Sequence, residues 1–193
     1  MASGDVQMGE LGSSPLTAAA SQGQEIKMFW VSADIASAEA LVARDGSGVT
    51  NFKSMEGKRT GVPFVSTPRY PLLAALGTAG GGARKVNIMN MRPPEIAAAW
   101  ERGDIDATFV WDPVLAKVKQ KGKVIATSGS IAQMGFPTFE GVVVTNKFAQ
   151  ENPEFMVAFV KALNRASAQV RDNLGKWTPE STEVKAIAKW CKA

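Results

Sequence analysis

The chain has 193 residues, a formal net charge of +4, 45% hydrophobic residues and 21% charged residues, a composition typical of a folded globular protein. It contains no histidine and a single cysteine, Cys191. This inventory excludes serine–histidine–aspartate hydrolysis, cysteine–histidine proteolysis, and metal sites built from histidine or clustered thiolates. The longest apolar runs, such as 26–33, are too short to span a bilayer. We therefore expect no metal and no cofactor.

The basic residues give no support for a nucleic-acid partner. They are scattered along the chain and do not cluster beside aromatic residues that could stack on bases. The densest group, 117–123, lies at the end of a predicted helix, where positive charges interact favourably with the helix dipole. We expect this group to be solvated and not to bind nucleic acid.

Strand and helix patterns alternate along the chain. Strands are predicted at 6–11, 26–32, 40–43, 58–65, 86–91, 105–111, 124–127 and 141–145, and the continuous apolar run of the second predicts that it is buried. Helices are predicted at 14–21, 69–78, 93–101 and 112–119, with three glycines at 80–82 ending the second. A long amphipathic helix begins at Pro153, and another begins near Thr178. The alternation predicts an α/β fold with a largely parallel sheet.

A short repeat suggests two related units. Gly4-Asp5-Val6 recurs 99 residues later as Gly103-Asp104-Ile105, and each copy leads into a strand followed by a proline-containing helix. Convergent local sequence is one explanation. Two similar strand–helix units are also what a two-lobed protein with a ligand cleft would contain.

Three strand-to-helix junctions are candidate binding loops, because ligands of α/β proteins bind where strands end and helices begin. They are Gly12-Ser13-Ser14, Ser66-Thr67 and Trp111-Asp112. Free N–H groups at a helix start, together with serine and threonine hydroxyls, are suited to an anion. The alternative is that these hydroxyls only cap their own helices.

Two carboxylates lie just before predicted strands: Glu39 precedes the strand 40–43, and Glu140 lies in the loop before the strand 141–145. Such carboxylates bind a ligand or are simply solvated. Trp111 stands at a loop end where an aromatic ring could contact a ligand, although tryptophan is more often a core residue. No nucleophile is paired with a base, so we predict no catalytic residues and no enzyme activity.

The chain resembles the taurine- and alkanesulfonate-binding periplasmic proteins of ABC importers. The segments that carry the resemblance are 2–7, 11–16, 37–42, 62–67, 72–76, 92–96, 103–106, 110–113 and 137–138. It implies a two-lobed type II periplasmic-binding-protein fold that closes on a small-molecule ligand. It also implies a periplasmic location, although the chain as written shows no signal peptide, and a monomer that delivers its ligand to an ABC permease in the inner membrane.

The resemblance also implies roles for the candidate residues. Ser13, Ser14, Ser66 and Thr67 correspond to sulfonate donors, and Glu39 to a partner of the ammonium group. Glu140 stands where taurine-binding proteins often have an aspartate, and the predicted binding set is completed by Gly12, Trp111 and Asp112. The two acids favour an aminoalkanesulfonate such as taurine over a plain alkanesulfonate.

The sequence departs from the family pattern in two respects. Pro68 and Arg69 follow Thr67 in place of the usual residues: Pro68 removes a backbone donor, and Arg69 either contacts the anion or points to solvent. Relatives also have a strand and a helix before the segment that begins here. We therefore expect the first strand and helix of lobe one to be missing and the isolated chain to be loosely packed. The expected division is 1–45 and 146–193 in lobe one, with 146–193 its C-terminal helices, and 46–145 in lobe two.

Two other functions remain open. The same fold serves as the effector-binding domain of sulfur-responsive transcriptional regulators, which would require a DNA-binding helix pair that this sequence does not show. Enzymes resembling thiamine-pyrimidine synthases also share it, but their chemistry depends on histidine, which is absent here.

Overall fold

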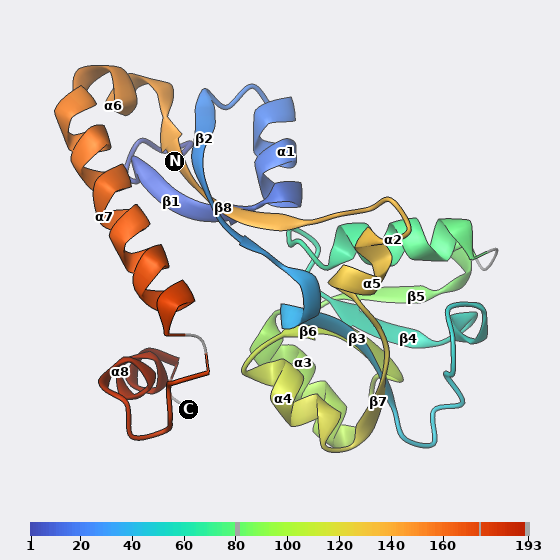
Figure 1. Ribbon diagram of the computed structural model, residues 1–193. Coiled ribbons are helices and arrows are strands. Elements are labelled where there is room, and N and C mark those ends of the chain that lie inside the picture. The colour runs from blue at the N-terminus through green and yellow to red at the C-terminus, as the bar shows by residue number, and fades with distance from the viewer. Residues whose placement is uncertain (80–81, 174, 192–193) are drawn as a thin grey trace.

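The computed structural model describes residues 1–79, 82–173 and 175–191, and within them the strands form two sheets (Figure 1). A three-stranded sheet has the order β1-β8-β2 and a five-stranded sheet the order β5-β4-β6-β3-β7. The strands are β1 (Met8–Gly12), β2 (Ile26–Asp34), β3 (Glu39–Arg44), β4 (Arg59–Val62), β5 (Asn87–Asn90), β6 (Ala107–Trp111), β7 (Gly122–Thr127) and β8 (Phe139–Thr145). The helices are α1 (Ser13–Ser21), α2 (Arg69–Thr78), α3 (Pro93–Arg102), α4 (Val114–Lys119), α5 (Ser128–Ala132), α6 (Asn146–Glu151), α7 (Pro153–Asp172) and α8 (Thr182–Cys191).

The α/β class is confirmed, but the expectation of a largely parallel sheet is wrong. Only β4 pairs in parallel, with β5 on one side and β6 on the other. β3 runs antiparallel to both β6 and β7, and the three-stranded sheet is antiparallel throughout. The chain enters β3 from the other sheet through a short connection, so no crossover helix constrains β3 to be parallel.

The five-stranded sheet is buried on both faces. Alternate residues of β3 point to opposite sides: Leu41 and Ala43 join one apolar cluster, while Ala40 and Val42 join the other. Helices α2 and α5 contribute to the first cluster, and α3 and α4 to the second. Helices thus cover both faces of this sheet, which explains the almost uninterrupted apolar sequence of β3.

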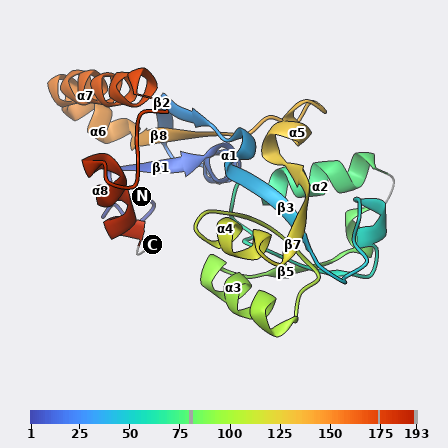
Figure 2. The ribbon, with the colours of Figure 1, turned by 60° about the horizontal axis from the view of Figure 1, so that its bottom comes forward.

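The three-stranded sheet is packed much less closely. The predicted burial of β2 is wrong, because its residues are partly or fully exposed, with Val31 at 60%. Helix α7 lies against this part of the protein (Figure 2), where Phe159 packs on Phe29 with ring centroids 6.2 Å apart. No residue of α7, which is described along its whole length, is buried. The two apolar clusters therefore both belong to the five-stranded sheet.

The chain crosses between the sheets twice. It leaves β2 for β3 through a 3-10 turn, Ala36–Ala38, and returns from α5 to β8. The crossings are joined by a hydrogen bond from the Ile35 N–H to the Thr138 carbonyl, 3.4 Å long. A division into lobes remains a proposal, and the sheets favour boundaries at 35–38 and 133–138 rather than at 45 and 145.

The structure agrees with most predicted helices and adds two. The bounds of α2 coincide with the prediction, whereas α5 and α6 were not predicted. Each of the two begins after a threonine whose hydroxyl accepts a backbone N–H: Thr127 from Ser130 and Thr145 from Phe148. Of the predicted glycine stop, Gly80 and Gly81 lie outside the described residues. No described helix has the length and apolar character needed to cross a membrane.

The uneven distribution of the core predicts uneven stability. Backbone amides of β3, β4 and β6 should exchange with deuterium far more slowly than those of β1 and β2, because local opening is easiest where few apolar contacts are broken. Hydrogen–deuterium exchange with peptide resolution measures this, with binding of the dye ANS as a second probe of exposed apolar surface. Equal protection of the two sheets, with no ANS binding, would contradict the prediction.

Candidate functional site

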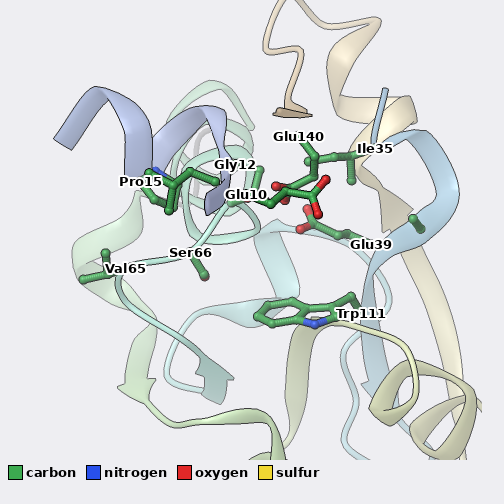
Figure 3. Close-up of a pocket in the computed structure, with 12 residues that line it drawn as sticks. Glu10, Gly12, Pro15, Ile35, Glu39, Val65, Ser66, Trp111 and Glu140 are labelled. Atoms are coloured by element: carbon green, nitrogen blue, oxygen red, sulfur yellow. The ribbon is translucent and has the colours of Figure 1, made fainter. Parts of the chain in front are cut away.

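A cavity of about 480 Å³ lies where the two sheets meet, at the ends of their strands (Figure 3). The three-stranded sheet and the start of α1 contribute one side, and β3, β6 and the loop after β4 contribute the other. The lining residues are Glu10, Leu11, Gly12, Pro15, Ile35, Ala38, Glu39, Val65, Ser66, Thr67, Trp111 and Glu140. Six of the nine predicted binding residues are therefore brought together: Gly12, Glu39, Ser66, Thr67, Trp111 and Glu140.

Each copy of the sequence repeat precedes a strand that ends at this cavity. Gly4 and Gly103 both adopt a left-handed conformation, with φ of 82° and 80°, and a strand begins four residues after each. These strands, β1 and β6, end at Gly12 and Trp111, which are also 99 residues apart and both line the cavity. The two strand–helix units that follow the repeated Gly-Asp pair thus face one ligand-sized space.

The end of β1 packs tightly against the loop before α2 at Gly12. A Cβ atom at this position would collide with Thr67 Oγ1 and would lie 2.9 Å from Glu140 Oε1. Thr67 Oγ1 donates a hydrogen bond of 3.2 Å to the same Glu140 oxygen. Glycine is required here because the Thr67 hydroxyl occupies the space that a side chain would need.

Glu39 is a buried carboxylate, with only 4% of its surface exposed. Burial raises the pKa of Glu39 to about 7, a hydrogen bond of 2.9 Å from Ser128 Oγ lowers it in part, and the negative charge of Glu140 raises it further. Burial also raises the pKa of Glu140; the Thr67 hydroxyl opposes this, and the charge of Glu10 adds to it. The cavity thus holds acids whose ionisation is coupled.

Glu10 lines the cavity and was not predicted. Figure 3 shows its carboxylate turned toward those of Glu39 and Glu140. Strand alternation provides the signal that could have identified it, because Glu10 is two residues before Gly12 and so lies on the same face of β1. If Gly12 faces a ligand, strand alternation predicts that the Glu10 side chain faces it too.

The hydroxyl groups divide between two cavities. Ser66 and Thr67 line the first, where the Ser66 hydroxyl donates to the Pro63 carbonyl. Ser13 and Ser14 instead line a neighbouring cavity of about 500 Å³, together with Thr17 and Tyr70 on its wall. Both cavities adjoin the first turn of α1.

The start of α1 offers N–H groups near these cavities, whereas in the first turn of α2 the Tyr70 N–H already donates to the Thr67 carbonyl and Pro71 has no N–H. The residue before α1 is Gly12 and the residue before α2 is Pro68, and within the described chain neither helix start is capped by a side-chain hydrogen bond. The alternative that Thr67 only caps its helix is therefore wrong for its hydroxyl, which donates to Glu140. Uncapped helix starts are suited to accept an anion.

Two expectations about neighbouring residues need correction. Asp112 lines neither cavity; its Oδ1 accepts the N–H of Ala116 at 2.9 Å and so stabilises the start of α4. Arg69 also lines neither cavity, because its guanidinium lies 3.9 Å from the centroid of the Phe64 ring and donates to the Phe64 carbonyl. Neither residue is positioned to contact a ligand in the cavity.

The cavity is lined by acidic residues, without basic partners among the described residues of its lining. Three carboxylates line it, and no lysine or arginine is among the described residues that do so. Within the described ranges, no group of three or more His, Cys, Asp or Glu side chains is arranged to hold a metal ion. Carboxylates suit a ligand cation, and the backbone N–H groups at the start of α1 suit an anion, whereas the hydroxyl hydrogens of Ser66 and Thr67 are already donated to other partners.

Comparison with known proteins identifies the relatives of the chain. A family model described as "NMT1/THI5 like" matches residues 1–173. The taurine-binding periplasmic protein of Escherichia coli K12 is 40% identical over 98% of this chain, and a putative aliphatic sulfonates-binding protein of Bacillus subtilis 168 is 28% identical over 98% of it. The chain spans 58% and 57% of the length of these two relatives.

The fold is shared with solved structures. The alkanesulfonate-binding protein SsuA of Xanthomonas axonopodis pv. citri, solved with MOPS bound, has a TM-score of 0.75 at 20% identity, covering 90% of this chain and 60% of that protein. The described α/β architecture is therefore that of type II periplasmic binding proteins, in the part that this chain covers.

Substituting Gly12 tests the close approach of the sheets. Gly12→Ala should lower the free energy of unfolding by about 1–3 kcal/mol, because the added methyl group displaces Thr67. Gly12 has an ordinary φ of −69°, so the backbone itself tolerates alanine. Gly9→Ala in the same strand is the matched control, since a Cβ there meets nothing within 4 Å. Equal stability of both variants in urea denaturation would refute the close contact.

The raised pKa of Glu39 predicts how stability changes with pH. The folded state retains a proton that the unfolded state loses near pH 4.5, so the contribution of neutral Glu39 is lost as pH rises toward 7 and above. The free energy of unfolding of Glu39→Gln minus that of the wild type should therefore increase by about 2 kcal/mol when the pH is raised from 5 to 8. Denaturation at both pH values measures this, with the exposed Glu25→Gln as control. A difference that does not change with pH would rule out the buried, raised-pKa carboxylate.

Proposed function

Because this chain belongs to the NMT1/THI5-like family, we propose that it is a periplasmic solute-binding protein of an ABC importer and that its solute is taurine or a related aminoalkanesulfonate. The observation that carries the proposal is the composition of one cavity. Glu39 and Glu140 line it together with Ser66, Thr67 and the start of α1. These groups match the two poles of a zwitterion.

The ammonium pole is assigned to the carboxylates. Glu39 is buried beside Glu140, and both have a raised pKa, so a ligand cation relieves their repulsion when it binds. Each carboxylate already accepts one hydroxyl hydrogen bond, from Ser128 or from Thr67, and retains further acceptor capacity. An ammonium group in this position forms charge-assisted hydrogen bonds.

The sulfonate pole is assigned to the start of α1 and the Ser66–Thr67 loop, which lie next to Glu140 and contact it through Thr67. A sulfonate is ionised at every physiological pH and requires donors that are already in position. The uncapped first turn of α1 and the loop that carries Ser66 and Thr67 offer backbone N–H groups. The hydroxyls of Ser66 and Thr67 already donate to the Pro63 carbonyl and to Glu140, so each would have to leave that partner to donate to the sulfonate. Pro68 supplies no N–H, which limits this set on the α2 side.

The magnitude of these contacts fits solute capture. A micromolar dissociation constant corresponds to about −8 kcal/mol. Four or five charge-assisted hydrogen bonds, each contributing about 1.5–3 kcal/mol, are enough for this after the loss of ligand and side-chain freedom. The relatives named above are binding proteins, and the proposed role is capture and delivery to a membrane permease without chemical conversion.

Removing one carboxylate tests the proposal. Glu39→Gln should weaken taurine binding by about tenfold or more, because a charge-assisted hydrogen bond is lost, and should leave ethanesulfonate binding nearly unchanged. Isothermal titration calorimetry with both ligands measures this. Glu25→Gln, which makes the same charge change on the exposed surface, should match the wild type. Equal losses for both ligands would show that Glu39 does not recognise the ammonium group.

A further inference from the structure

We propose that Glu10 is a specificity-determining residue, the third carboxylate around the ligand's ammonium group, and that the cavity therefore selects a primary ammonium over its N-methylated forms. The inference rests on the proposed function, since it concerns the cationic pole of the same ligand.

Glu10 is held in position although it is exposed. Ser32 Oγ donates a hydrogen bond of 2.6 Å to Glu10 Oε1. β1 and β2 are not neighbours in the sheet, so this bond reaches across β8. It is formed where the pairing of β2 with β8 shifts register between Val31 and Ala33, an irregularity of the kind that redirects a side chain. A glutamate fixed in this way differs from a freely solvated surface carboxylate.

The three glutamates share one arrangement. Glu10, Glu39 and Glu140 reach the cavity from β1, β3 and β8, and Figure 3 shows their carboxylates turned toward one another. Each accepts one hydroxyl hydrogen bond from the protein: from Ser32, Ser128 and Thr67 respectively. Each therefore retains acceptor capacity for a ligand.

The number of carboxylates matches the number of donors on a primary ammonium. Such a group has three N–H bonds, and each methyl substituent removes one of them. A cavity with two carboxylates would satisfy a monomethylated ammonium fully, whereas three carboxylates leave one acceptor unmatched. A trimethylated ammonium has no N–H and would depend on the face of Trp111 instead.

Calorimetry with a graded set of ligands tests the inference on the full chain. Taurine, N-methyltaurine and N,N-dimethyltaurine are titrated into the wild type, Glu10→Gln and the surface control Glu25→Gln. The wild type should bind taurine about tenfold more tightly than the dimethylated ligand. In Glu10→Gln, taurine affinity should fall by about three- to tenfold and the preference over the methylated ligands should shrink, because an exposed charge contributes less than a buried one.

A second variant separates position from charge. Ser32→Ala keeps the carboxylate but removes the hydrogen bond that orients it, so it should shift the selectivity in the same direction as Glu10→Gln. Circular dichroism melting of each variant identifies any loss of folding, which would lower all affinities together and leave the ligand preference unchanged.

The outcomes distinguish a failure of the role of Glu10 from a failure of the proposed function. Selectivity that falls in both variants and persists in Glu25→Gln supports the role of Glu10. If the wild type binds taurine but the preference among the three ligands is the same in Glu10→Gln, or if the dimethylated ligand binds as tightly as taurine, the role of Glu10 is wrong and the proposed function stands. If the wild type binds none of these sulfonates, the proposed function itself is wrong.

Discussion

The burial of the Glu39 carboxylate beside Glu140 is the constraint around which the site is organised. A carboxylate with a pKa of about 7 destabilises the folded protein by about 3 kcal/mol when it is ionised, a large fraction of the stability of a domain. A lysine or arginine nearby would remove that cost, yet none is among the described residues that line the cavity. Titratable groups held in so unfavourable a state are typical of functional sites. In the proposed function, the ligand's ammonium provides the missing compensation.

The fold brings these acids together by crossing twice between its sheets. Glu39 begins β3 directly after one crossing, and Glu140 lies at the start of β8 directly after the other. The close contact of Gly12 with Thr67 then holds the start of α1 against the loop that carries Ser66 and Thr67. Binding geometry therefore depends on the part of the molecule where the sheets meet, while both apolar clusters surround the five-stranded sheet and the three-stranded sheet adds only a few buried residues, such as Val143 and Val144.

Much of this arrangement could be predicted from the sequence, because the signals were local. The helical pattern at 69–78, followed by three glycines, gave the bounds of α2, and the repeated glycine–aspartate pair led to the strand ends at Gly12 and Trp111. The direction of β3 could not be predicted, because it depends on which sheet the preceding strand joins. The burial of β2 was also mistaken, because an apolar run indicates that a strand can be buried but not that other elements cover it.

At the site, the sequence could not separate ligand-binding residues from helix-capping residues, because both kinds are polar residues that follow the end of a strand. Asp112 and Ser13 both follow a strand end, as ligand-binding and helix-capping residues do, and only the position of α4 identifies Asp112 as a stabilising contact of that helix. Glu10 was missed because a charged residue in an alternating strand is usually solvated, and the bond from Ser32 is a contact between distant parts of the chain.

A structure of the protein with taurine bound tests the central claim most directly. The account predicts the taurine nitrogen within hydrogen-bond distance, about 3 Å, of the carboxylates of Glu39 and Glu140, and the sulfonate oxygens against the start of α1 and the Ser66–Thr67 loop. Taurine bound in the reverse orientation, or with its amine directed to solvent away from the glutamates, would contradict it.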